Sequence, residues 1–195
     1  MRRFILLVVA VFALLSTAWG QSAWDSEIVL RKFEILDLDF STCPAPDGGL
    51  YVLYVTGVLG DISIYLQKIN TDGMLAWNDP VLITGQNNSA KKKYSMFSSG
   101  DGNFFVYWLQ DNGHYISKID PSGQFLWNPS HRLIFQNTYY RNSKSYVLDN
   151  NGGLYFFYSR YIAVNNSDIW GQHISASGEF LYPGDGVQIP DDPRF

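Results

Sequence analysis

One turn-and-strand motif recurs along this chain, and its last occurrence reads Asn151-Gly152-Gly153-Leu154-Tyr155-Phe156-Phe157-Tyr158. A strand with only one buried face alternates apolar and polar residues, because successive side chains point to opposite faces. This run does not alternate, so we expect both of its faces to be covered, as in a strand between stacked sheets. The Asn-Gly-Gly segment before it indicates a hairpin turn, since tight turns need residues that accept φ > 0.

The same motif occurs twice more, upstream. It reads Asp47-Gly48-Gly49-Leu50-Tyr51-Val52-Leu53-Tyr54 in the first case and Asp101-Gly102-Asn103-Phe104-Phe105-Val106-Tyr107-Trp108 in the second. The period is therefore close to 50 residues. A repeat of that length is typical of chains that stack small structural units.

Two further blocks follow each motif, always in the same order. The first ends in a glycine that we expect to turn the chain into a fourth strand, and the second carries the Trp or Tyr of that strand. The first block spans Tyr65–Gly73, Tyr115–Gly123 and Trp170–Gly178; the second spans Leu75–Asn78, Phe125–Asn128 and Phe180–Pro183. Three blocks in a fixed order, three times, predict three structural repeats.

Each repeat is expected to form four short strands. The first strands are predicted at Phe40–Cys43, Tyr94–Ser99 and Ser145–Leu148. The third strand alternates, with Ile62, Ile64 and Leu66 on one face. No apolar period of 3.6 residues occurs after the N-terminal segment, so almost no helix is expected.

Four strands in units of about 50 residues are typical of propeller blades. The predicted fold is all-β, a β-propeller-like stack of about three four-stranded antiparallel blades. We divide the chain into a signal peptide (1–20), an N-terminal strand segment (21–39), and blades at 40–86, 87–137 and 138–195.

The first 20 residues have the three parts of a secretory signal peptide. Arg2 and Arg3 form a basic start, Phe4–Leu15 is an apolar run, and Ala18 and Gly20 are small residues before the expected cut. A membrane-spanning helix needs about 20 apolar residues, which is longer than this run. We expect export through the inner membrane, to the periplasm, the cell surface or the medium; an uncleaved anchor is the alternative.

Composition excludes several classes of protein. Without Arg2 and Arg3, 12 basic residues face 18 acidic ones and the net charge is −6, which argues against nucleic acid as a partner. Hydrophobic residues make up 46% of the chain and aromatic residues 16%, which excludes intrinsic disorder. A single cysteine, Cys43, excludes an internal disulfide framework and a Cys-rich zinc site. We expect Cys43 to be a buried small hydrophobe, with intermolecular pairing as the alternative.

The segment Ser167–Val187 resembles a repeat of secreted bacterial proteins. That repeat runs Asp-Ile-Tyr-Ala-Gln-Arg-Ile-Asp, then a turn ending in Gly, then Leu-Trp and Asn-Gly-Val. Its carriers are large extracellular or cell-surface proteins, many of them cargo of type IX secretion, and the repeats are thought to form β-propeller-like blades. This chain departs from the pattern because Lys68, Lys118 and His173 stand where the family has Arg.

A propeller usually has 4–8 blades, so three would leave two apolar sheet faces bare. From this we expect an incomplete ring, either a truncated product or the N-terminal part of a longer protein. The alternatives are a ring completed by another copy and a curved open stack.

No catalytic, cofactor or metal site is predicted. The three histidines, His114, His131 and His173, occupy unrelated repeat positions and are expected to be surface or half-buried residues. Loops between the second and third strands vary most, and variation on one face of a repeat protein is where binding is often found. The residues predicted for such a contact surface are Trp108, Asp111, His114, Arg160 and Tyr161.

The expected function is that of a secreted, non-catalytic repeat module acting in binding or as an extracellular scaffold. Its partner would be an extracellular protein or glycan, without nucleic acid, and without a membrane once the signal is cleaved. One alternative is part of a secreted carbohydrate-active enzyme, a glycoside hydrolase-like propeller whose catalytic site lies outside this chain. The other is a structural segment of the cell surface with no ligand of its own.

Overall fold

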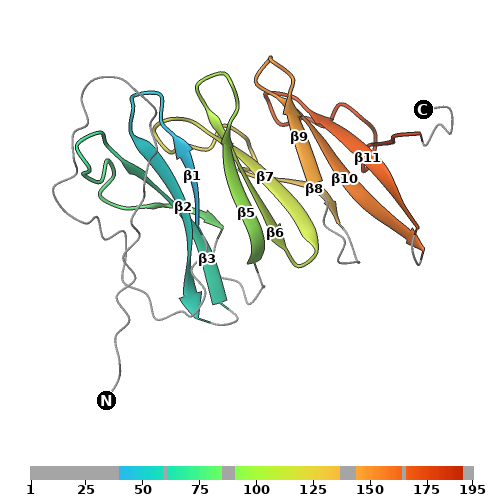
Figure 1. The fold of residues 1–195 in the computed structure, drawn as a ribbon, viewed down its shortest axis with the longest axis horizontal. Coiled ribbons are helices and arrows are strands. Elements are labelled where there is room, and N and C mark those ends of the chain that lie inside the picture. Colours follow the sequence, from blue (N-terminus) through green and yellow to red (C-terminus); the bar gives the residue numbers. More distant parts are fainter. Residues whose placement is uncertain (1–39, 59–60, 85–90, 137–143, 164–165, 191–195) are drawn as a thin grey trace. The chain divides into compact units, whose positions relative to one another are not determined.

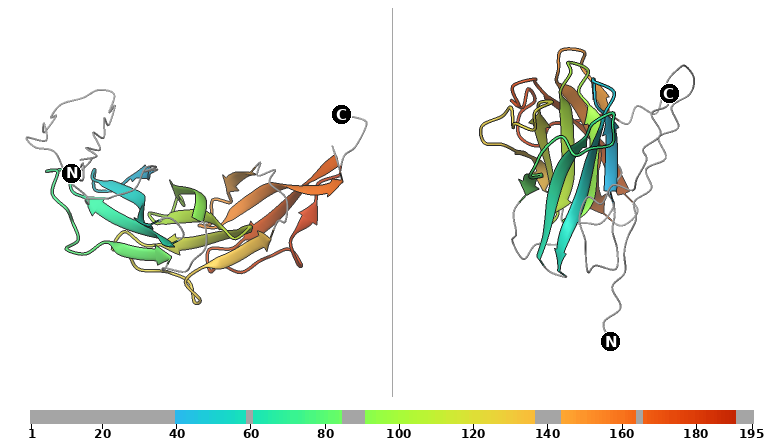
Figure 2. Two further views of the ribbon diagram at one scale, coloured as in Figure 1. Left: turned by 90° about the horizontal axis from the view of Figure 1, so that it is seen from below. Right: turned by 90° about the vertical axis from the view of Figure 1, so that its left-hand side faces the viewer.

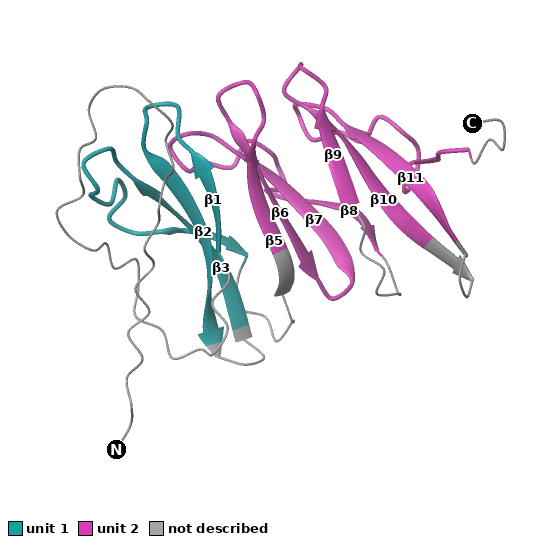
Figure 3. Ribbon diagram, viewed as in Figure 1, with its two compact units in different colours: residues 1–90 teal, residues 91–195 magenta. Residues whose placement is uncertain are grey.

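A computed structural model describes residues 40–58, 61–84, 91–136, 144–163 and 166–190. The chain forms two compact units, 1–90 and 91–195, which Figure 3 shows in different colours. The expected signal peptide and the N-terminal strand segment lie outside the described residues.

The described residues form three four-stranded antiparallel sheets, and strand order follows chain order in each (Figure 1). Sheet 1, in the first unit, contains β1 (Phe40–Pro44), β2 (Leu50–Val58), β3 (Asp61–Ile69) and β4 (Val81–Thr84). In the second unit, sheet 2 contains β5 (Lys91–Ser98), β6 (Phe104–Gln110), β7 (Gly113–Ile119) and β8 (Arg132–Gln136). Sheet 3 contains β9 (Lys144–Leu148), β10 (Leu154–Ala163), β11 (Asn166–Ile174) and β12 (Val187–Gln188). The described part contains no helix, as the views of Figure 2 also show, so the all-β prediction is confirmed.

Glycines with positive φ make both kinds of predicted turn. In the turn that leads into each apolar strand, φ is +85° at Gly48, +87° at Gly102 and +81° at Gly152. In the turn after the third strand it is +83°, +90° and +82° at Gly73, Gly123 and Gly178. The Cβ atom of any other residue would be strained in this region, which explains why glycine recurs there.

The fourth strands begin later than predicted. The aromatic residues expected in them, Trp77, Trp127 and Tyr182, precede β4, β8 and β12 and lie in bends. Buried glutamine amides hold two of these bends, because Gln67 Nε2 donates to Trp77 O (3.0 Å) and Gln172 Nε2 donates to Tyr182 O (3.2 Å). A proline, which has no N–H for a sheet ladder, follows each aromatic residue within three positions.

The apolar second strands differ in how far they are buried. In β2, Tyr51, Val52, Leu53 and Tyr54 are all buried, and all five residues of Phe104–Trp108 in β6 are buried too. Both faces are therefore covered there, as predicted. The prediction is wrong for β10. Leu154, Phe156 and Tyr158 on one face are buried, whereas Tyr155 and Phe157 on the other are half-buried.

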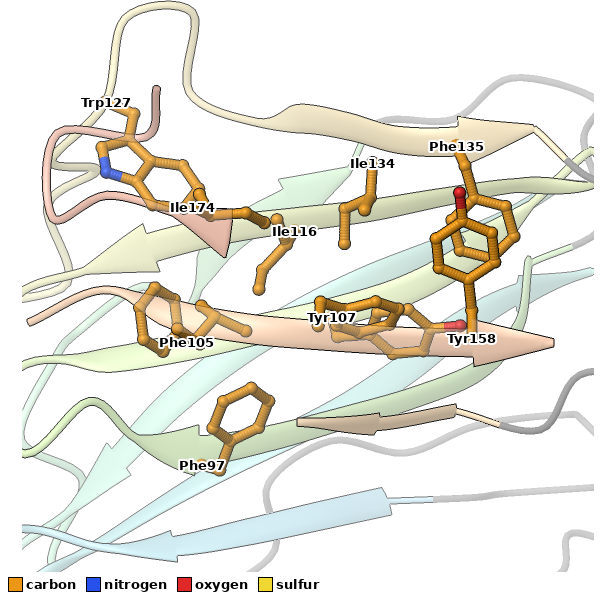
Figure 4. Packing of buried hydrophobic residues seen from close by; sticks show 11 residues of the cluster. Phe97, Phe105, Tyr107, Ile116, Trp127, Ile134, Phe135, Tyr158 and Ile174 are labelled. Atoms are coloured by element: carbon orange, nitrogen blue, oxygen red, sulfur yellow. The ribbon is translucent and has the colours of Figure 1, made fainter. Parts of the chain in front are cut away.

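Sheets 2 and 3 share one hydrophobic core in the second unit (Figure 4). Aromatic rings stack across it: Phe135 on Tyr158 with centroids 3.6 Å apart, and Tyr107 on Phe156 at 5.6 Å. The buried side chains of this core are Phe97, Phe105, Tyr107, Ile116, Trp127, Ile134, Phe135, Leu154, Phe156, Tyr158 and Ile174. The two sheets therefore stack face to face.

Hydrogen bonds to a turn of sheet 3 fix how that stack is aligned. Trp127 Nε1 donates to Ala176 O (2.9 Å), and Arg132 Nε donates to Gly178 O (2.9 Å). The Trp127 ring lies against Gly178, where an added Cβ would approach ring atoms within 2.7–2.9 Å. Directed bonds of this kind select one alignment, which apolar burial alone does not do.

One buried residue is predicted from the cysteine count. Cys43 is 5% exposed, so its predicted burial is confirmed. Its strand, β1, pairs it with Tyr51 of β2.

The Trp127 contact predicts a difference between two glycine variants. Gly178→Ala and Gly102→Ala both place a Cβ at positive φ, but only Gly178→Ala also meets the Trp127 ring, since nothing lies within 4 Å of a Cβ at Gly102. We expect Gly178→Ala to lower the free energy of unfolding by about 1–3 kcal/mol more than Gly102→Ala. Urea titration of the full chain measures this difference. Equal losses of unfolding free energy in the two variants would contradict close packing of the Trp127 ring on Gly178.

Candidate functional site

A cluster of four side chains marks one end of sheet 2. Asp101 comes from the turn before β6, Phe105 from β6, Lys118 from β7, and Trp127 from the bend after β7. Lys118 Nζ lies 2.5 Å from Asp101 Oδ2 and 5.6 Å from the Phe105 centroid, and the rings of Phe105 and Trp127 are 6.0 Å apart. Phe105 and Lys118 are directly paired across β6 and β7, which places the cation beside the ring.

The first unit contains the same cluster in sheet 1. Lys68 Nζ lies 2.5 Å from Asp47 Oδ2 and 5.6 Å from the centroid of Tyr51. Tyr51 and Trp77 have centroids 6.1 Å apart, and Tyr51 is paired with Lys68 across β2 and β3. The arrangement of acid, cation and two aromatic rings is therefore not particular to one sheet.

Sheet 3 has the cluster in altered form. His173 Nε2 lies 2.9 Å from Asp149 Oδ2, and the imidazole stacks on Tyr155 with centroids 4.1 Å apart. Tyr182 meets the same imidazole edge to face at 6.1 Å. Histidine thus stands where the other sheets have lysine, and tyrosine stands where they have tryptophan.

The acid of sheet 3 comes from a different place in its turn. Alignment of the turns puts Asn151 where Asp47 and Asp101 stand, so sequence comparison of the repeats does not select Asp149. The turn is closed by a bond from Asp149 N to Gly153 O. From this position Asp149 Oδ1 still accepts from Asn151 N and Gly153 N, each at 2.8 Å, and Oδ2 still reaches the imidazole.

These acids stay ionised because the turns donate hydrogen bonds to them. Burial acts to raise the pKa of Asp101, but the hydrogen bonds from Lys118, Ser99 and the Asn103 N–H outweigh it and lower the pKa to about 2. For Asp149, burial again opposes the shift, and bonds from His173 and the turn N–H groups lower the pKa. Each carboxylate therefore joins its turn to the neighbouring strand as an anion.

In the second unit, sheet 3 covers the cluster of sheet 2. Lys118 Nζ donates not only to Asp101 but also to Gly152 O of sheet 3, at 2.7 Å. Its side chain is 3% exposed. A buried ammonium group is tolerated only when its donors are satisfied, so both acceptors are needed. The cluster is thus a contact between stacked sheets.

The opposite face of sheet 3, which we call the outer face, carries its own cluster without such a cover in the described part of the chain. It also carries apolar side chains, of which Val147 and Ile169 are each 56% exposed. A Cβ at Gly171 would meet Phe157 at 3.1 Å and Ile189 at 3.7 Å, so these residues share that face. The outer face is defined by Val147, Tyr155, Phe157, Ile169, Gly171, His173, Tyr182 and Ile189.

Two residues predicted for a contact surface are buried instead. Trp108 belongs to β6, is 1% exposed and stacks on Tyr115 with centroids 5.6 Å apart. His114 belongs to β7, is 1% exposed and stacks on Phe135 at 3.9 Å. The predicted surface or half-buried position of His114 is therefore wrong. The reason is that the loop between β6 and β7 contains only Asp111 and Asn112, so both residues lie within strands.

The remaining predicted contact residues do not gather into one site. Asp111 is exposed in its turn, with φ of +48°. The Arg160 side chain is 48% exposed, with its guanidinium 4.6 Å from the Trp170 ring centroid and 3.9 Å from Asp185 Oδ2. The backbone of Tyr161 pairs with Ser167, but its side chain lies outside the described residues.

Neither a metal centre nor a membrane helix is found in the described part. No group of three or more His, Cys, Asp or Glu side chains there is placed to hold a metal ion. No described helix is long and apolar enough to cross a membrane. Of the other histidines, His131 is exposed and His173 half-buried, as predicted.

Comparison with known proteins adds no assignment. No protein-family model matches the chain, and no curated protein matches it. The interpretation of the clusters and of the outer face therefore rests on their geometry alone.

The burial of Lys118 predicts a large effect of removing its charge. Lys118→Met leaves Asp101 and Gly152 O without their shared donor, and we expect a loss of about 3 kcal/mol in the free energy of unfolding. Lys68→Met is the matched control, because its acid partner is 55% exposed and water replaces the lost bond. Urea titration of both full-chain variants measures the difference. If the Lys118→Met protein were as stable as the Lys68→Met protein, Lys118 would not hold sheets 2 and 3 together.

The low pKa of Asp101 predicts acid sensitivity. The folded-state pKa of about 2 is below the ordinary value of 3.8, so the ionised group stabilises the fold above pH 4. This contribution disappears as the pH falls from 4 towards 2. We expect it to be about 1–2 kcal/mol after solvent screening, since the side chain is 34% exposed. Asp101→Asn should therefore make the unfolding free energy decline less steeply between pH 4 and pH 2. If the slope of unfolding free energy against pH did not change, the low pKa of Asp101 would be contradicted.

Proposed function

We propose that this chain is a secreted, non-catalytic β-propeller-type repeat module that acts in binding or as an extracellular scaffold. One observation carries the proposal. An acid, a basic side chain and a pair of aromatic rings recur together in all three sheets, and between sheets 2 and 3 the cluster joins one sheet to the next. A blade is a sheet that stacks on its neighbours in this way.

The arrangement of strands supports the term blade. Each sheet is a four-stranded antiparallel meander built from one continuous segment. The strand next to the first edge is apolar, and in β2 and β6 it is buried on both faces, as stacking requires. The resemblance of Ser167–Val187 to secreted bacterial repeats agrees with this reading.

The use made of the polar groups supports a structural role for them. Asp101 and Lys118 are engaged by a turn and by the neighbouring sheet, and the Tyr107 hydroxyl lies 2.6 Å from His114 Nδ1 in the core. Burial raises the pKa of Tyr107, so its hydroxyl stays protonated. Groups held in this manner maintain packing.

Export is the part of the proposal that rests on residues 1–20. We expect the full chain, produced in a Gram-negative host, to be found outside the cytoplasm with Gln21 as its first residue. Leu7→Arg is the matched control, because a charge in the apolar run blocks insertion and should leave the precursor uncut. Cell fractionation and mass spectrometry of the N-terminus measure both. An uncleaved wild-type chain in the cytoplasm would refute secretion.

The same purified protein distinguishes a binding or scaffold module from part of a carbohydrate-active enzyme. We expect no new reducing ends when it is incubated with a panel of soluble polysaccharides. Release of reducing ends that rises with protein concentration, and is lost on unfolding in urea, would favour the enzyme.

A further inference from the structure

The outer face of sheet 3 corresponds, position by position, to the face of sheet 2 that packs against sheet 3. In sheet 2, Phe105 of β6 is paired with Lys118 of β7 and Phe97 of β5. In sheet 3, Tyr155 of β10 is paired in the same manner with His173 and Val147. Each of these outer-face residues of sheet 3 therefore has a counterpart in sheet 2, and sheet 3 covers that counterpart.

Covering changes the exposure of these positions. Phe97 is 9% exposed because the Tyr146 ring of the next sheet stacks on it, with centroids 3.7 Å apart. Its counterpart Val147 is 56% exposed. Phe105 is fully buried, and its counterpart Tyr155 is half-buried. The two sheets thus show one kind of face in a covered and an uncovered condition.

The hydrogen-bond donors on the covered face of sheet 2 also have counterparts on the outer face of sheet 3. Trp127 donates to the carbonyl of Ala176 and Lys118 to that of Gly152, and both acceptors belong to turns of the incoming sheet. Tyr182 and His173 occupy the corresponding places in sheet 3. The Tyr182 hydroxyl can donate a hydrogen bond, whereas His173 Nε2 already lies 2.9 Å from Asp149 Oδ2. We therefore expect an incoming sheet to direct a turn carbonyl at Tyr182.

We propose that the outer face of sheet 3 binds one further four-stranded blade of this same repeat, a proposal that rests on the proposed function. The incoming blade presents glycine turns towards Tyr182 and His173. It also presents apolar side chains at alternate positions of its second strand, as sheet 3 does with Leu154, Phe156 and Tyr158. The established interface between sheets 2 and 3 is the template, because it joins the same two kinds of face.

The test adds a blade of known sequence to the chain. A second copy of residues 137–190 replaces residues 191–195 after Pro190, in a Cys43→Ala background with Val147→Cys in the first copy only. Maleimide labelling then reports whether position 147 is accessible. We expect labelling at least about tenfold slower in the extended chain than in the unextended one, as burial of the corresponding Phe97 implies.

Matched variants separate docking from general effects. Leu126→Cys places a thiol at a residue that is 45% exposed and lies outside the outer face, so its labelling rate should not change on extension. Phe157→Asp in the first copy should restore fast labelling of Val147→Cys, because it puts a charge into the contact. His173→Lys in the first copy reproduces the lysine of sheet 2 and should slow labelling further.

Three results would overturn the proposal. The first is equal labelling of Val147→Cys in the two chains while the added copy is folded, judged by the increase of the β signal in circular dichroism. The second is an added copy that stays unfolded. The third is protection in the unextended chain that grows with concentration, which would assign the face to a second copy of the chain. None of these depends on export or on polysaccharide cleavage, so the proposed function is tested separately.

Discussion

The buried ammonium group of Lys118 is central to the second unit. Apolar contact between Phe105, Tyr107 and the facing side chains of sheet 3 supplies attraction, but attraction of this kind is non-directional. The ammonium group is directional, because Asp101 and the carbonyl of Gly152 must both reach it. Their positions fix the alignment of sheets 2 and 3, and the bond from Trp127 to Ala176 holds the same end of the stack.

The same four positions carry different chemistry in the three sheets. In sheet 3 an imidazole replaces the ammonium group and the acid, Asp149, has moved along the turn, yet the two side chains still meet, with His173 Nε2 2.9 Å from Asp149 Oδ2. The turn tolerates this because Asp149 Oδ1 accepts from two N–H groups at its new position. Geometry is thus retained where the sequence has changed, which explains why alignment of the turns misses the acid.

Sequence patterns work well for local features here and poorly for the candidate site. Glycine positions and apolar runs predict the turns and the first three strands, because φ and side-chain alternation are local properties. The fourth strands are misplaced because amides of Gln67 and Gln172, ten residues away from Trp77 and Tyr182, bind the bends. Trp108 is misjudged because the neighbouring loop is only two residues long.

By itself, the sequence determined an all-β chain with three four-stranded units, glycine turns and a buried Cys43. These follow from backbone conformation and from the apolar character of short runs. Only the tertiary structure decided which faces are covered, that His114 is in a core, and that Asp149, Tyr155, His173 and Tyr182 form one cluster. Burial and ion pairing depend on the segments that meet in space, and one-dimensional spacing does not specify them.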